Sequence, residues 1–197
     1  MNLLVILGPT ASGKTHLAVQ AARHLNGEII SADSRQVYRG LDIGSGKDLA
    51  EYGATPYHLI DIVDPGCEFS LFNFVQEFTR VYDEVVSRGS LPILAGGTGL
   101  YLDAVLRGYD LVKIEKNLPL RQELEELELA ALVERLCKLR PELHNTTDLT
   151  DRERLTRAIE IAEGEKQPVA GPIDWPDLSP RVFGLRWQRD ILRQRIT

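Results

Sequence analysis

A glycine-rich segment near the start of the chain constrains the fold more than any other feature of the sequence. Residues 8–15 read Gly-Pro-Thr-Ala-Ser-Gly-Lys-Thr; they follow the apolar run Leu3 to Leu7 and lead into apolar residues at helical spacing from Lys14 to Leu25. A buried strand, a glycine loop and an amphipathic helix in this order form a P-loop, in which backbone N–H groups, the helix dipole and a lysine surround a phosphate. The sequence therefore predicts an α/β domain that opens with a phosphate-binding loop.

Every residue of this loop is a candidate ligand of a phosphate or diphosphate: Gly8, Pro9, Thr10, Ala11, Ser12, Gly13, Lys14 and Thr15. Lys14 is expected to supply positive charge, and the Thr15 hydroxyl is expected to bind Mg²⁺. The motif does not distinguish ATP from another nucleotide or from a diphosphate.

Further apolar segments predict a parallel sheet. Strands are expected over residues 28–32, 57–63, 91–95 and 181–187, and helices over residues 71–88, 151–163 and 188–197. Because helical segments separate the strands, right-handed crossovers should place the strands in one sheet, with the ligand beyond their C-terminal ends. The expected fold class is α/β, a P-loop NTPase-like parallel sheet flanked by helices, with a small helical appendage.

The second half of the chain differs from the first in its composition. Residues 115–134 carry six acidic and two basic residues among leucines, which is typical of a solvated helical surface. We predict a core over residues 1–112 and about 181–197, and a helical appendage over about 113–165. Four prolines exclude regular helix from residues 165–180, which are expected to form a linker.

Composition excludes several classes of protein. The chain is 43% hydrophobic and 26% charged, as in an ordinary globular domain, and no apolar run approaches the roughly 20 residues that a membrane span needs. The two cysteines lack the spacing of a zinc site. A net charge of −6 argues against attraction of the whole surface to nucleic acid. We expect a cytoplasmic protein, without membrane contact and monomeric.

Two more polar loops should lie on the same edge of the sheet as the P-loop. Asp33 opens the segment Asp-Ser-Arg-Gln-Val-Tyr directly after a predicted strand, and Gly96 opens Gly-Gly-Thr-Gly-Leu-Tyr after another. The Asp33 carboxylate could bind Mg²⁺ through water or accept a proton, but an aspartate after a strand is also common as a helix cap or turn residue. Glycines at a strand tip by themselves usually indicate only a turn.

The three loops together are more specific than each alone. GPTASGKT, DSRQVY and GGTGLY, in this order, resemble the tRNA dimethylallyltransferases, also called tRNA isopentenyltransferases, and residues 151–160 resemble a segment which that family uses against tRNA. The resemblance implies transfer of a dimethylallyl group from dimethylallyl diphosphate to the N6 amine of an adenine next to the anticodon of tRNA. Family members extend further with a C-terminal helical region, so we expect this chain to be a short or C-terminally truncated member.

The resemblance also implies roles for particular residues. Asp33 would be the general base, Lys14 would stabilise the leaving diphosphate, and Thr98 would contact the diphosphate or the adenosine. Thr15 would hold Mg²⁺, the expected cofactor. Contacts with tRNA are expected from Asp33, Ser34, Arg35, Gln36, Thr98, Glu153, Arg154, Leu155, Thr156 and Arg157.

Three other functions stay open at the level of sequence. A small-molecule P-loop kinase would need a basic lid, which Arg135, Lys138 and Arg140 could supply. A prenyltransferase that acts on a free adenine nucleotide would share the P-loop. A non-catalytic RNA- or nucleotide-binding remnant is the third alternative.

Overall fold

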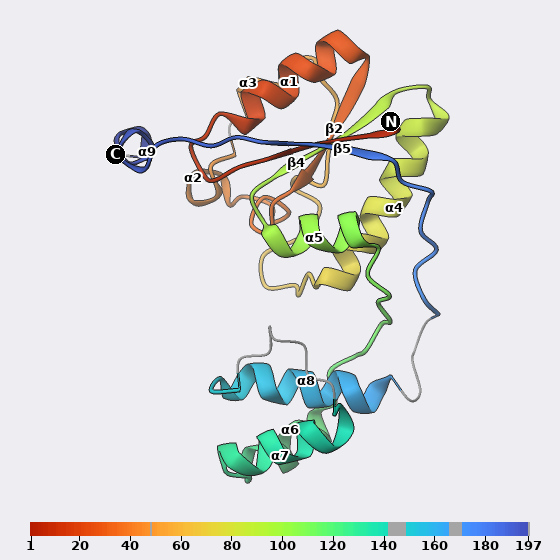
Figure 1. Ribbon diagram of the computed structural model, residues 1–197, viewed down its shortest axis with the longest axis vertical. Coiled ribbons are helices and arrows are strands. Elements are labelled where there is room, and N and C mark those ends of the chain that lie inside the picture. The colour runs from red at the N-terminus through yellow and green to blue at the C-terminus, as the bar shows by residue number, and fades with distance from the viewer. Residues whose placement is uncertain (48, 142–148, 166–170, 197) are drawn as a thin grey trace. The chain divides into compact units, whose positions relative to one another are not determined.

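A computed structural model describes residues 1–47, 49–141, 149–165 and 171–196 of the chain. The chain divides into two units, the first comprising Met1–Tyr109 with Asp174–Thr197 and the second comprising Asp110–Ile173 (Figure 1). The first unit contains the P-loop, and the second contains the segment that the resemblance connects with tRNA.

A parallel sheet forms the centre of the first unit, with five strands among the described residues. The strands are β1 (Leu3–Leu7), β2 (Gly27–Ala32), β3 (Tyr57–His58), β4 (Leu91–Gly96) and β5 (Pro180–Gly184), in the spatial order β3-β2-β4-β1-β5. The inner strands are mostly apolar because helices cover both faces of the sheet, and Leu3, Ile30 and Leu94 are fully buried. The fold class predicted from the sequence is confirmed.

Helices flank this sheet on both sides. On one face lie α1 (Lys14–Leu25) and α3 (Leu49–Tyr52), and on the other lie α4 (Leu71–Ser87) and α5 (Gly99–Arg107) (Figure 1). The predicted start of α4 is confirmed by its cap: Ser70 Oγ accepts a hydrogen bond from the Asn73 N–H at 3.2 Å, and Asn73 Oδ1 accepts one from the Ser70 N–H at 3.1 Å. This reciprocal pair satisfies two N–H groups that a helix start leaves unpaired.

The predicted strand over residues 57–63 is wrong in its extent. Only Tyr57–His58 forms a strand, paired with β2. Leu59 and Asp61 have φ angles of 62° and 55°, in the left-handed region, and this ends the extended conformation. The chain then passes beside the loop that follows β2, where Tyr38 and Val63 form an isolated bridge.

The last strand is also shorter than the predicted range of 181–187. β5 ends at Gly184, but Leu185 continues the pairing because its N–H donates to the carbonyl oxygen of Leu7 at 2.8 Å. The expected terminal helix is α9, Arg189–Ile196. Of the predicted linker, residues 166–170 lie outside the described residues, and residues 171–179 form neither helix nor strand.

The second unit consists of helices around a leucine core. Its helices in the described residues are α6 (Leu118–Glu125), α7 (Leu129–Leu139) and α8 (Arg152–Gly164). Leu124, Leu132 and Leu136 of α6 and α7 and Leu155 and Ile159 of α8 are fully buried there. The Asp151 side chain caps α8 by accepting a hydrogen bond from the Arg154 N–H at 3.0 Å. No helix in the described part of the chain is long and apolar enough to span a membrane.

Candidate active site

Three loops lie along one edge of the sheet because the strands before them end at the same position in the register. Leu7 of β1 lies opposite Gly96 of β4 and Gly184 of β5, and Ala32 of β2 is also opposite Gly96. Gly96 is required at this point because a Cβ there would lie 2.2 Å from the carbonyl oxygen of Ala32. The loops that follow Leu7, Ala32 and Gly96 are those singled out in the sequence, so the fold brings the three segments together.

The P-loop turns at two residues in the left-handed region, Ala11 with φ 60° and Gly13 with φ 84°. Gly13 is the N-cap of α1, and in the described structure no side chain caps this helix. The N–H groups of the first turn of α1 are therefore available to an anion, which the helix dipole also favours.

Lys14 lies against the loop from which it projects. Its Nζ donates to the carbonyl oxygen of Pro9 at 3.2 Å, an acceptor that it shares with the Ser12 N–H at 3.3 Å. Burial lowers the pKa of Lys14, and the negative charge of Asp33 opposes this effect. A pocket contains both side chains, and its lining also includes Thr15, Gln36, Tyr52 and Gly96. In this partly desolvated pocket, the lysine charge acts on an anion more strongly than it would in water.

The loops after β2 and β4 are joined by hydrogen bonds. The Ser34 N–H donates to Thr98 Oγ1 at 2.9 Å, and the Thr98 N–H donates to the carbonyl oxygen of Ala32 at 3.1 Å. Asp33 Oδ1 accepts a hydrogen bond from the Arg35 N–H at 3.0 Å, which is an Asx turn. Asp33 is therefore a turn residue and also a pocket residue, and the two interpretations left open by the sequence are compatible.

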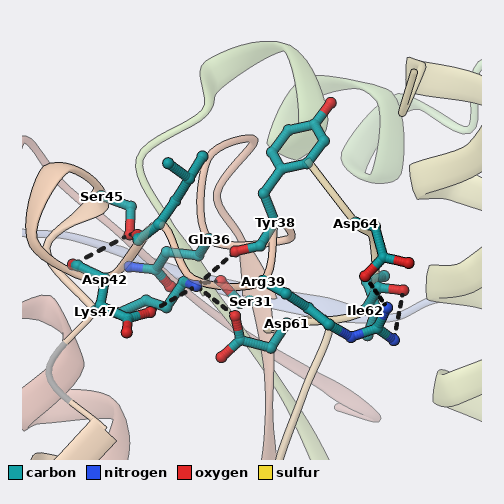
Figure 2. A network of polar contacts seen from close by, with 11 residues as sticks. Ser31, Gln36, Tyr38, Arg39, Asp42, Ser45, Lys47, Asp61, Ile62 and Asp64 are labelled. Carbon is teal, nitrogen blue, oxygen red and sulfur yellow. Dashed lines mark hydrogen bonds and ion pairs between the residues drawn. The ribbon is translucent and has the colours of Figure 1, made fainter. Parts of the chain in front are cut away.

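A buried lysine that sequence reasoning missed fixes the far end of this loop. The Lys47 side chain is fully buried, and its Nζ donates to the carbonyl oxygen of Tyr38 at 2.6 Å, to Asp61 Oδ1 at 2.5 Å and to Asp42 Oδ1 at 3.2 Å (Figure 2). The chain turns at Leu59 and Asp61, which both have positive φ angles, and the Asp61 carboxylate then meets the ammonium group.

The same network orients Gln36 at the pocket. The carbonyl oxygen of Gln36 accepts a hydrogen bond from the Asp61 N–H at 3.0 Å, and Gln36 Oε1 accepts one from Ser31 Oγ at 3.0 Å (Figure 2). Both ends of this residue are thus held. A fixed side-chain amide suits recognition of a heterocyclic base, because its donor and acceptor positions are defined.

Two tyrosines near the site had no role in the sequence analysis. Tyr52 lines the pocket beside Thr15, and burial raises its pKa to about 12. Burial also raises the pKa of Tyr101 to about 12, and its ring stacks on Phe74 with centroids 3.9 Å apart. Both hydroxyls stay protonated near neutral pH, so neither competes with Asp33 as a base.

The segment expected to contact tRNA is divided between surface and core. Glu153 and Arg154 are exposed, and Thr156 and Arg157 are half-buried. Leu155 is fully buried in the core of the second unit, and its contact with tRNA stays a prediction that this burial does not favour. The helical period explains the difference, because α8 needs one apolar residue per turn to pack on α6 and α7.

The residues that could have formed a kinase lid are paired with carboxylates. Arg135 bonds Glu123 and Glu163, with nitrogen–oxygen distances of 2.6 and 2.8 Å. Lys138 pairs with Glu134 at 2.7 Å, and Arg140 pairs with Glu165. These pairs weaken the case for a basic lid.

The oxygen donors at the site are compatible with Mg²⁺. The described residues contain no group of three or more His, Cys, Asp or Glu side chains that could hold a metal ion. Mg²⁺ bound to phosphates does not need such a group, because it takes one or two protein oxygens and completes its shell with phosphate oxygens and water. Thr15 and Asp33, which line the same pocket, offer a hydroxyl and a carboxylate of this kind.

These features define a P-loop α/β protein with a polar pocket at the C-terminal edge of its sheet. A family model described as IPP transferase matches residues 36–197, and one described as isopentenyl transferase matches residues 1–55. The chain belongs to the IPP transferase family, and the resemblance predicted from the sequence is confirmed.

Individual relatives agree with the family models. Over its whole length the chain is 64% identical to a protein named tRNA dimethylallyltransferase 2 of Syntrophotalea carbinolica and covers 66% of it. The solved tRNA isopentenylpyrophosphate transferase of Bacillus halodurans has 40% identity and a TM-score of 0.65, with 99% of this chain and 63% of that one covered. A eukaryotic dimethylallyltransferase acting on tRNA has 25% identity and a TM-score of 0.77, with 98% of this chain and 50% of that one covered. The chain thus spans less than two thirds of the length of these proteins.

Proposed function

We propose that this chain transfers a dimethylallyl group from dimethylallyl diphosphate to the N6 amine of an adenine next to the anticodon of tRNA. The observation that carries the proposal is the convergence of Lys14, Asp33 and Thr98 from three loops at one edge of the sheet, in a chain that belongs to the IPP transferase family. The names of the relatives support the substrate and the acceptor.

The reaction breaks the bond between C1 of the dimethylallyl group and the diphosphate oxygen, and forms a bond from C1 to N6. The P-loop from Gly8 to Thr15 binds the diphosphate through N–H groups at the start of α1, and Lys14 stabilises the negative charge that grows on the diphosphate as the bond breaks. Asp33 accepts the proton that N6 loses, which leaves a neutral secondary amine and free pyrophosphate. The Thr15 hydroxyl would hold Mg²⁺, which would supply further positive charge to the diphosphate.

On the acceptor side, Thr98 and Gln36 are proposed to orient the adenosine, since the Ser34 N–H and the Ser31 hydroxyl hold these two side chains. Ser34 and Arg35 are exposed in the same loop, and we propose that they contact the RNA. Glu153, Arg154, Thr156 and Arg157 of the second unit remain proposed tRNA contacts. A cytoplasmic location follows from a tRNA substrate, and a monomer is the expected state.

Calorimetric titration with dimethylallyl diphosphate and Mg²⁺ tests the proposal. Lys14→Ala should lower the affinity about 100-fold or more, because the loop loses a charge-assisted contact in a partly desolvated pocket. Lys138→Ala removes an exposed lysine and should bind like the unmodified chain. Unchanged affinity in Lys14→Ala would remove the P-loop from the mechanism.

Labelled dimethylallyl diphosphate with tRNA, AMP or ATP as acceptor then separates the alternatives. Label in tRNA is the expected result. Label in AMP or ATP alone would indicate a nucleotide prenyltransferase, and phosphate transfer from ATP that depends on Lys138 would indicate a kinase.

A further inference from the structure

The segment that follows β5 contacts the P-loop from a distant part of the sequence. Trp187 Nε1–H donates to the carbonyl oxygen of Ser12 at 2.9 Å, and Arg195 Nε–H donates to the carbonyl oxygen of Ala11 at 2.9 Å. We call Ala11 and Ser12, the two residues before Gly13, the crest of the P-loop. Two consecutive carbonyls of the crest thus have side-chain donors that lie 175 and 184 residues away in the chain.

The two donors also support each other. The guanidinium carbon of Arg195 lies 4.6 Å from the centroid of the Trp187 ring, a cation–π contact. The segment begins in register with the sheet, because the Leu185 N–H donates to the carbonyl oxygen of Leu7 at 2.8 Å. Leu185 then packs beside Gly8, where a Cβ on the glycine would lie 3.1 Å from Leu185 Cβ. We call Trp187 and Arg195 the crest brace.

The brace acts on the groups that a diphosphate needs. In a planar trans peptide the C=O and the next N–H point in opposite directions. Holding the carbonyl of Ser12 on the side of Trp187 therefore directs the N–H of Gly13 to the opposite side. Arg195 holds the preceding peptide plane, whose Ser12 N–H donates within the loop to the carbonyl oxygen of Pro9 at 3.3 Å. Ala11 is in the left-handed region, which a residue with a Cβ adopts at a cost and keeps only when its surroundings hold it there.

Arg195 also adds charge near the anion site. Its Nη2 lies 3.8 Å from the position that a Cβ on Gly13 would occupy, beside the N-terminus of α1. A simpler reading is that the loop carbonyls only anchor a terminal helix. That reading does not explain why both donors engage consecutive carbonyls of the crest, where the peptide planes decide which way the N–H groups face.

We propose that Trp187 and Arg195 are positioning residues of the diphosphate site, which hold the P-loop crest in the conformation that binds the anion. The inference rests on the proposed function, since it takes the P-loop ligand to be a diphosphate. It extends that function by making the phosphate-binding loop depend on a segment that follows the last strand.

Calorimetric titration of the full chain with inorganic pyrophosphate and Mg²⁺ tests the brace. Arg195→Ala should lower the affinity about tenfold or more, and Trp187→Phe, which keeps a ring but loses the donor, by a smaller factor. Arg195→Lys keeps the charge but loses the planar fork, so it should behave more like Arg195→Ala than like the unmodified chain. Arg189→Ala removes the same charge from an exposed position of the same helix and is the matched control.

Amide hydrogen exchange of residues 10–14, with and without pyrophosphate, gives a second measurement that does not depend on affinity. Pyrophosphate should slow exchange there in the unmodified chain, and Arg195→Ala should speed exchange in the free protein while thermal unfolding stays close to that of the control. Faster exchange with unchanged pyrophosphate affinity would overturn the proposal, because the contacts would then be only structural. If the unmodified chain binds no pyrophosphate, the proposed diphosphate site fails together with the brace, whereas binding that no brace variant weakens overturns the brace alone.

Discussion

Two clusters of charged side chains, one in each unit, serve different purposes. In the first unit, Lys14 and Asp33 line a pocket at the sheet edge, and each has a hydrogen bond to the backbone of its own loop. In the second unit, Arg121 binds both oxygens of Glu160 and Arg157 binds one of them, and the Glu160 side chain is fully buried among the helices. The first arrangement leaves charge for a ligand, and the second uses charge to hold helices together.

The difference shows that basic residues in a sequence do not by themselves indicate an RNA surface. Arg157 was expected to contact tRNA, yet it also donates to the carbonyl oxygen of Ile114 at 3.0 Å and so joins α8 to the segment before α6. Burial raises the pKa of Glu160, but hydrogen bonds from Arg121, Arg157 and the Asn117 N–H outweigh this and lower it to about 2. A carboxylate held in this way is part of the fold of the second unit.

The largest expected effect is on the rate of dimethylallyl transfer, when the carboxylate of Asp33 is removed. Asp33→Asn should lower the single-turnover rate of dimethylallyl transfer to tRNA about 10²- to 10⁴-fold and leave diphosphate affinity nearly unchanged, because asparagine keeps the acceptor for the Arg35 N–H but not the base. Asp103→Asn, at an exposed ion pair with Arg107, is the control. A rate near that of the unmodified chain would leave Asp33 as a turn residue only.

The corresponding change in the second unit should affect stability instead. Glu160→Gln leaves Arg121 and Arg157 without their carboxylate, and breaking a buried ion pair from one side typically costs about 3 to 5 kcal/mol of unfolding free energy. Glu134→Gln breaks an exposed pair with Lys138 and should leave the unfolding free energy nearly unchanged. Urea unfolding followed by circular dichroism measures both variants. Equal costs would mean that Glu160 is no more structural than a surface residue.

Acid should weaken both units over the same pH range. Hydrogen bonds from Arg88, assisted by His58, lower the pKa of Glu28 in the first unit to about 2, as for Glu160 in the second. Because both folded-state pKa values lie below the ordinary value of 4.5, the stabilisation is complete above about pH 4.5 and is lost as the pH falls toward 2. Unfolding free energies measured between pH 6 and pH 2 should fall in that window. The unfolding free energy of the Glu160→Gln variant should fall less steeply with pH than that of the unmodified chain. Parallel curves for the variant and the unmodified chain would contradict the role of Glu160.

Much of the fold could be predicted because local patterns determine it. The apolar runs located β1, β2 and β4, and the Ser70 cap located the start of α4, since these signals depend on residues close in the sequence. The strand over 57–63 could not be bounded in this way, because the alternating pattern continues through Leu59 and Asp61 although their backbone turns left-handed.

The candidate site likewise has parts that local sequence predicts and parts that only the tertiary structure determines. The three loops could be found because each follows a strand, and a parallel sheet brings its strand ends together. Lys47 and the crest brace could not, because their partners are set by tertiary structure: Lys47 meets Asp61 only after an unpredicted turn, and Trp187 meets Ser12 across 175 residues. A motif compared as a string also does not show which residues of α8 face the core, as Leu155 does.

The smallest expected effect distinguishes a solvent-facing arginine of α8 from a structural one. Arg154 has 65% of its side chain exposed and lies 3.7 Å from Asp151, whereas Arg157 has 33% exposed and binds Glu160. If Arg154 contacts a phosphate of tRNA, Arg154→Ala should lower the slope of log affinity against log salt concentration by about one unit and leave the unfolding free energy nearly unchanged. Arg157→Ala should instead lower the unfolding free energy, since it removes a partner of a buried carboxylate.

Fluorescence anisotropy titrations of labelled tRNA over a salt series, with urea unfolding of each variant, measure both quantities. A slope near zero for the unmodified chain, or one that Arg154→Ala does not change, would show that α8 does not hold tRNA through this residue.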